Sequence, residues 1–244
     1  MARIRDSRRL PSENSAYTRL LGNPQLGQLL SRVQAAVIRQ GNELEALVEQ
    51  SVPTLVKTTI AEILADPNAF AAGAVPRIQA VFGHHLPVLV QAEAEATSRR
   101  GSTIDLVIFD HEERRLTVVE LKDGHVFDTK KADGERTSMT AAAARLRELT
   151  GYASAFALCG FNADSRDDII YGAKERFSLE EVMTGRELCA LLSVDYDALR
   201  RGREAEQPEN LRYFISELIE IDEVRAFIYE ALGLSGRAQE RTDL

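Results

Sequence analysis

The chain has 244 residues, of which 44% are hydrophobic and 28% are charged, and its formal net charge is −8. This length and apolar content suit one large globular domain or a core with an appendage, and no apolar run approaches the ~20 residues of a membrane helix. The net negative charge argues against a protein that coats nucleic acid through a broadly basic surface, but it is compatible with a local basic cleft.

Helical spacing of apolar residues dominates the chain from about Pro24 to Phe82. From His85 the period changes, and an apolar start is followed by alternating Glu and Ala and a turn signal. The next stretch, "IDLVIFDHEERRLTVVELK" over residues 104–122, is typical of two apolar strands joined by a charged turn. These segments predict a three-stranded meander that begins after His85.

The second half of the chain continues with a polar loop at residues 123–138, which contains TKKADGER, and an alanine-rich helix predicted over 140–159. A short apolar strand is predicted over 167–173, and helices are predicted again over 178–194 and 209–233. This order of elements predicts an α/β core with a small mixed sheet. We expect the core to span residues 85–175, between an N-terminal helical region at 1–84 that packs on it and a C-terminal helical region at 176–244.

The two predicted strands at 104–122 carry three charged residues among apolar ones. If the turn is centred between Glu112 and Glu113, facing residues have numbers that sum to 225, and Asp105 lies opposite Glu120. Facing carboxylates repel each other, so a cation is needed near them. Period two places Lys122 on the same face as Glu120. The alternative is a solvent-exposed alternation of these charges, but the strands are otherwise apolar on both faces, which predicts a central place in a covered sheet.

Two carboxylates with a nearby backbone carbonyl, such as that of Leu121, form the all-oxygen ligand set that suits Mg²⁺. Lys122 could hold a water molecule beside the ion or help to deprotonate it. By contrast, the adjacent His84 and His85 have no cysteine or third histidine at ligand spacing, so we predict a helix end there and not a metal site.

Asp105, followed in the next strand by Glu120-Leu121-Lys122 and then by a helix and another strand, resembles the PD-(D/E)xK nuclease superfamily, especially type II restriction endonucleases. The resemblance covers roughly residues 38–175, and Ile104 stands where the family pattern has proline. It implies a restriction-endonuclease-like core with helical N- and C-terminal additions. It also implies catalytic roles for Asp105, Glu120 and Lys122, with Asp105, Glu120 and the Leu121 carbonyl as Mg²⁺ ligands.

In that family an upstream helix often contributes a glutamate to the site. The stretch RQGNELEALVEQ resembles this helix and places Glu45 in the usual position, whereas Glu43, Glu49 and Glu62 are competing candidates. The alternative for Glu45 is a solvated surface position on a charged helix.

The implied function is Mg²⁺-dependent cleavage of double-stranded DNA at a short specific site. The alternatives are a nonspecific or structure-specific repair nuclease on the same fold, or an inactive DNA-binding module. The predicted DNA contacts are Arg99, Arg100, Lys130, Lys131 and Arg136. The apolar residues of the C-terminal helices exceed what one core face can cover, so we expect a homodimer.

No membrane segment or export signal is visible in the sequence. Cys159 and Cys189 lie in apolar surroundings without paired spacing, which predicts two reduced core residues and a cytoplasmic protein.

Overall fold

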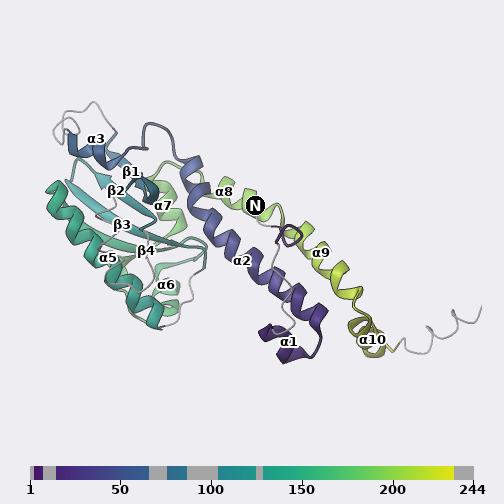
Figure 1. Cartoon of the computed structure of the whole chain (residues 1–244). Helices are drawn as coiled ribbons and strands as arrows, with labels where there is room; N and C mark the ends of the chain where they lie inside the picture. The colour runs from purple at the N-terminus through teal and green to yellow at the C-terminus, as the bar shows by residue number, and fades with distance from the viewer. Residues whose placement is uncertain (1–2, 8–14, 66–75, 87–103, 125–128, 234–244) are drawn as a thin grey trace, which may run out of the picture. The chain divides into compact units, whose positions relative to one another are not determined.

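The computed structural model describes residues 3–7, 15–65, 76–86, 104–124 and 129–233 (Figure 1). The chain divides into two compact units, of which one is Leu44–Arg200 and the other combines Met1–Glu43 with Arg201–Leu244. The three regions expected from the sequence, with boundaries at 84/85 and 175/176, remain a prediction. None of the helices within the described ranges is long and apolar enough to cross a membrane.

A five-stranded mixed sheet forms the centre of the larger unit, with the strand order β1-β2-β3-β4-β5. Its strands are β1 (Ile78–Phe82), β2 (Leu106–Asp110), β3 (Arg115–Lys122), β4 (Ala153–Gly160) and β5 (Val182–Thr184). β1, β2 and β3 form an antiparallel meander, whereas β4 runs parallel to β3 and β5 runs parallel to β4. The predicted α/β fold with a mixed sheet flanked by helices is confirmed, and it is consistent with a restriction-endonuclease-like core.

Helices cover both faces of this sheet. One face packs against α3 (Ile60–Ala65), α5 (Thr129–Thr150) and α6 (Arg166–Gly172). The long helix α5 runs along this face in Figure 1. The other face packs against the last two turns of α2 (Pro24–Ser51), α7 (Gly185–Leu191) and the first residues of α8 (Tyr196–Glu204). In the described part of this unit the 3₁₀ turns η2 (Gly83–His85) and η3 (Leu179–Glu181) also occur.

The register of the β2–β3 hairpin agrees with the sequence prediction. Leu106 faces Val119 and Asp110 faces Arg115, so each facing pair has numbers that sum to 225. Residues 106–109 of β2 and 118–121 of β3 are buried, as expected for central strands covered on both faces. A slip of one residue would have moved every side chain to the opposite face, so the register specifies where the charged residues lie.

The first strand of the meander lies earlier than the sequence predicted. β1 occupies Ile78–Phe82, within the region assigned to helix, and the stretch expected to form this strand after Leu86 lies outside the described residues. The sequence IQAVF is buried at four of its five positions, so it shows neither strand alternation nor a helical stripe. Its outer edge is covered by backbone hydrogen bonds between Ala80 and the residues Val56 and Thr58.

The predicted loop at 123–138 and the predicted helix at 140–159 are also corrected. Helix α5 begins at Thr129 and takes in TKKADGER, and it ends at Thr150. Gly151 follows with a φ of +70°, the left-handed conformation that commonly terminates a helix. The segment ASAFALCG is then strand β4, because its small apolar side chains fit a parallel strand buried among other strands.

The predicted strand at 167–173 is instead helix α6 (Arg166–Gly172) with its C-cap at Ala173. Ser165 caps this helix by accepting the N–H of Asp168, while the Asp168 carboxylate accepts the N–H of Ser165. This reciprocal pattern is a helix start signal that outweighs the short apolar run. The stretch predicted as helix at 178–194 includes η3, strand β5 and helix α7.

The smaller unit is helical, as expected for the terminal additions. It contains α1 (Ala16–Leu21), the first part of α2, α9 (Gln207–Ile219) and α10 (Asp222–Ala231). The guanidinium of Arg3 forms an ion pair with Glu206 at 2.8 Å, and Asn23 donates to Glu223 at 2.7 Å. Helices α9 and α10 contain no buried residue, so their packing within this unit leaves apolar side chains exposed.

Candidate active site

The charged residues of the hairpin gather where β2 begins and β3 ends. Asp105 immediately precedes β2, and continuing the register by one residue places it opposite Glu120. One carboxylate oxygen of Asp105 accepts the backbone N–H of Leu121 at 2.6 Å. Because the N–H and C=O of one strand residue point to the same edge, the Leu121 carbonyl also points toward Asp105.

Glu120 and Lys122 lie on the same face of β3 and form an ion pair. The side chain of Glu120 is 6% exposed, so this carboxylate is almost completely removed from water. The Lys122 ammonium also lies 3.2 Å from a carboxylate oxygen of Glu135 in α5. Burial alone would lower the pKa of Lys122, but Glu120 and Glu135 outweigh it and raise the pKa above its ordinary value. Lys122 therefore stays charged at neutral pH.

Asp105 and Glu120 are both harder to ionise than ordinary carboxyl groups. Burial raises the pKa of Asp105, and the hydrogen bond from Leu121 and the charge of Lys122 only partly offset this. Burial also raises the pKa of Glu120, and the negative charge of Asp105 raises it further. Ionising both groups would place two negative charges in a buried site, and a bound cation would stabilise that state.

Glu45 approaches this pair from helix α2. Burial raises the pKa of Glu45 to about 7, the charge of Asp105 contributes further, and a hydrogen bond with the backbone of Gly83 opposes the shift. Gly83 also donates its N–H to the carbonyl of Asp105 at 2.8 Å. A Cβ atom on Gly83 would lie 2.1 Å from the carbonyl oxygen of Ile104, so only glycine permits this close approach.

The three other candidate glutamates have different surroundings. Glu49 faces His84 and His85, and Glu62 is held at the surface by Thr58 and Thr59. Glu43 belongs to the smaller unit. The charge of Glu45 interacts with that of Asp105, which favours Glu45 among these candidates.

The predicted DNA contacts fall into three groups. Arg99 and Arg100 lie outside the described residues. Lys130 and Lys131 are exposed in the first turn of α5, so they lie on a helix and not in the expected loop. Arg136 is further along the same helix and forms a two-pronged ion pair with Glu181, at 2.7 and 3.2 Å.

Comparison with known proteins gives a relative over most of the chain. The chain is 36% identical over 227 residues to a protein named type II restriction enzyme HhaII from Haemophilus parahaemolyticus. The aligned region covers 92% of this chain and 97% of that enzyme. The chain belongs to the type II restriction enzyme family. No family model matches it, and no solved structure matches it at a significant level.

The site of this chain contains one residue that the sequence patterns do not predict. Glu135 reaches Lys122 from α5, and its side chain is only 13% exposed. The sequence predicts a loop over this segment, and a loop does not specify which side of the structure its residues face. The sequence does carry a signal for the burial of Glu135. Ala132, Glu135 and Met139 have the three- and four-residue spacing of one helical face, and Ala132 and Met139 are both buried.

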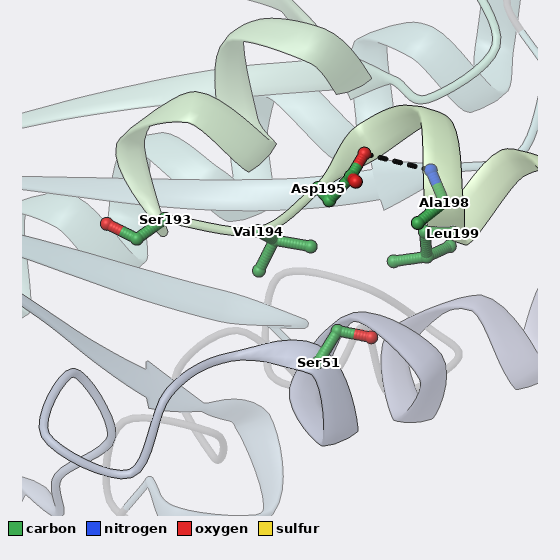
Figure 2. A pocket seen from close by; sticks show the side chains of 6 residues that line it. All are labelled: Ser51, Ser193, Val194, Asp195, Ala198 and Leu199. Carbon is green, nitrogen blue, oxygen red and sulfur yellow. Dashed lines mark hydrogen bonds between the residues drawn. The ribbon is translucent and has the colours of Figure 1, made fainter.

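A pocket of about 340 Å³ lies elsewhere in the larger unit and shares no residue with the site (Figure 2). It is lined by Ser51, Ser193, Val194, Asp195, Ala198 and Leu199. Its one ionisable side chain, Asp195, accepts the backbone N–H of Ala198 at 2.9 Å, shown by the dashed line in Figure 2. This contact satisfies the first turn of α8, so we assign Asp195 a structural role.

Proposed function

We propose that this restriction enzyme family member is a Mg²⁺-dependent endonuclease that hydrolyses phosphodiester bonds at a short specific site in double-stranded DNA. The observation that carries the proposal is the buried cluster of Asp105, Glu120 and Lys122 where β2 begins and β3 ends. We assign this cluster to the PD-(D/E)xK type of active site. Ile104 in place of proline is compatible with this type, because the side chain at 104 packs in the core and contributes no ligand atom.

The donor groups at the site fit Mg²⁺. Two carboxylates and a backbone carbonyl are hard oxygen ligands, and a site with few protein ligands leaves several waters on this ion. Burial is the main cause of the raised pKa values of Asp105 and Glu120, so a cation that enters this site would stabilise their ionised forms. In this proposal Asp105, Glu120 and the Leu121 carbonyl hold Mg²⁺. When bound, the ion supplies Lewis-acid stabilisation of the charge that develops on the phosphoryl group.

The side chains have distinct roles in the proposed reaction. Lys122, held between Glu120 and Glu135, remains protonated and donates hydrogen bonds that orient the attacking water and stabilise the phosphoryl oxygens. The water attacks phosphorus in line with the departing 3′ oxygen, which leaves a 5′-phosphate on the product. Glu45 has a pKa of about 7, so it is the carboxyl group best placed to take up a proton near neutral pH.

Lys130 and Lys131 are proposed to contact DNA phosphates, together with Arg99, Arg100 and Arg136. The two lysines lie at the N-terminal end of α5, where the positive end of the helix dipole also favours a phosphate. Arg136 would have to exchange its ion pair with Glu181 for a phosphate. Contacts of this kind give affinity, whereas base-edge contacts set the sequence preference.

We further propose that the enzyme is a cytoplasmic homodimer. Helices α9 and α10 expose Leu211, Ile215, Ile219, Phe227, Tyr229 and Leu232. Ile221, between the two helices, is buried within the chain and is not available to such an interface. A two-fold dimer places one active site on each DNA strand and matches a palindromic target. The two free cysteines, both buried, are compatible with a reducing compartment.

The direct test of the activity is digestion of two unrelated phage DNAs with Mg²⁺, followed by gel electrophoresis. A site-specific endonuclease gives discrete fragments whose ends share one sequence and carry 5′-phosphates. A smear at every enzyme concentration would contradict site specificity, and a retarded but uncut band would contradict nuclease activity.

A further inference from the structure

A second group of metal-binding side chains converges near the turn that follows β1. Glu49 lies in the last turns of α2, and His84 and His85 belong to η2. Nε2 of His84 lies 3.4 Å from Oε1 of Glu49, and Nε2 of His85 lies 3.9 Å from the same oxygen. One ligand atom from each side chain lies within 4.8 Å of the other two. The histidines do end a helical turn, as predicted, but it is the short 3₁₀ turn η2 that directly follows β1.

The separations between these atoms suit a shared ion better than hydrogen bonds. Hydrogen bonds from N–H to oxygen join atoms about 2.7–3.2 Å apart, and both histidine–glutamate distances are longer. Ligand atoms about 2.0–2.1 Å from a tetrahedral ion lie roughly 3.3 Å from one another. The distance from His84 to Glu49 matches this value, and a small rotation of the His85 ring would bring its nitrogen to it.

We propose that Glu49, His84 and His85 bind a divalent transition metal ion, with Zn²⁺ the best match. Two imidazoles and one carboxylate form a ligand set that leaves a fourth tetrahedral position for water. Imidazole nitrogen favours Zn²⁺ over Mg²⁺, whereas the Asp105–Glu120 cluster offers only oxygen. The chain therefore has two sites with different metal preferences. This inference goes beyond the proposed nuclease activity and does not depend on it.

The surroundings of the three side chains support ion binding. The side chains of His84 and His85 are about half exposed, at 54% and 43%, so an ion can reach them from solvent. Glu62 lies near enough to His85 for their charges to interact, and its carboxylate is fixed by Thr58 and Thr59. The negative charge of Glu62 also favours a cation beside His85.

A bound ion would join α2 to the end of β1. Glu49 lies one helical turn after Glu45, and Gly83, which contacts Glu45, directly precedes His84. The ion would therefore fasten the segment of α2 that carries Glu45 to the sheet. We expect Zn²⁺ to stabilise the fold, since the ligands are brought together only in the folded chain.

The experiment uses full-length protein freed of metal with a chelator. Zn²⁺ binding is measured by calorimetry, Co²⁺ is used as a visible-absorption probe of tetrahedral coordination, and thermal melting is recorded with each ion. Wild type should bind Zn²⁺ saturably, show the Co²⁺ band and melt higher with Zn²⁺. Glu49→Gln, His84→Gln and His85→Gln should each bind at least about tenfold more weakly and lose the band. Asp105→Asn and Glu112→Gln should behave like wild type.

The outcomes separate this site from the catalytic cluster. Loss of the Co²⁺ band in Asp105→Asn would place the ion at the cluster and overturn the proposal. Wild-type binding by either histidine variant, or no saturable Zn²⁺ binding by the wild type, would also overturn it. Circular dichroism shows whether each variant is folded. The three ligand substitutions test the same ion independently, so if one variant does not fold, the other two still decide the outcome.

Discussion

The ammonium group of Lys122 lies 3.2 Å from a carboxylate oxygen of Glu135, so helix α5 helps to hold the lysine at the end of β3. Lys122 is therefore fixed from two elements, because Glu120 pairs with it from its own strand. This arrangement makes Glu135 a positioning residue whose effect on the proposed reaction passes through Lys122.

Glu135→Gln should lower kcat about tenfold and leave KM for DNA little changed, because the lysine loses one of its two anchors while DNA contacts remain. Glu135→Asp should recover part of the rate. Steady-state cleavage kinetics provide the measurement, and Glu148→Gln, an exposed position on the same helix, is the control. Equal effects of Glu135→Gln and Glu148→Gln would argue against a positioning role.

Glu45→Gln should change the pH dependence of stability. The folded-state pKa of Glu45 is about 7 against an ordinary 4.5, so its favourable contribution is complete below pH 4.5 and is lost as the pH rises through 7. Without divalent ions, the variant should therefore gain about 1–2 kcal/mol over the wild type at pH 8, after allowance for partial exposure, and almost nothing at pH 4.5. Urea unfolding at both pH values measures this difference, and a pH-independent difference would contradict it.

Mg²⁺ binding should release protons from the wild type. Asp105 and Glu120 have raised pKa values, so part of the metal-free protein holds a proton that must leave when the carboxylates bind the ion. Calorimetry in two buffers of different ionisation enthalpy measures the release. Millimolar Mg²⁺ should also raise Tm, more at pH 8 than at pH 6 because protons compete less. Asp105→Asn should abolish both effects, and a Tm unaffected by Mg²⁺ in both proteins would exclude this site.

The proposed dimer predicts that charge on the C-terminal helices disrupts assembly. Ile215 is 45% exposed and Phe227 is 62% exposed, so replacing each with glutamate should leave the smaller unit folded. Light scattering should give a dimeric mass for the wild type and a monomeric mass for the double variant, which should cut double-stranded DNA at least about tenfold more slowly. Leu20→Glu in α1, at a residue 78% exposed, serves as the control. A monomeric wild type that cuts both strands would refute the dimer.

The sequence predicted the hairpin well because its information is local. The charged turn at Glu112 and Glu113 fixed the register, and the register fixed the facing of Asp105 and Glu120. Elements without such local signals were misassigned. β1 is buried at four successive positions, and β4 consists mainly of small residues. Neither sequence therefore has a hydrophobic pattern that distinguishes a strand from a helix.

Contacts between segments that are far apart in the chain could not be predicted from the sequence patterns. Glu135 contacts Lys122 because α5, which connects β3 to β4 in the chain, packs against the sheet. The sequence predicts a loop where the first turns of α5 lie, so it gives no indication of this contact. Glu49 and the two histidines meet because β1 ends beside α2, although the chain places them 35 residues apart, from 49 to 84. The spacing of residues 132, 135 and 139 can place Glu135 on the buried face of a helix, but it cannot identify Lys122 as its partner, and no spacing brings Glu49 to the two histidines.

The most direct test of the central claim compares DNA cleavage with DNA binding for Glu120→Gln. The variant retains the shape of the side chain but removes the charge that pairs with Lys122 and would bind Mg²⁺. Cleavage of a DNA that carries the target site is followed in Mg²⁺, and binding of the same DNA is measured in Ca²⁺. The account predicts a loss of cleavage of at least about a hundredfold with binding within a few fold of the wild type. Wild-type cleavage by Glu120→Gln would contradict it.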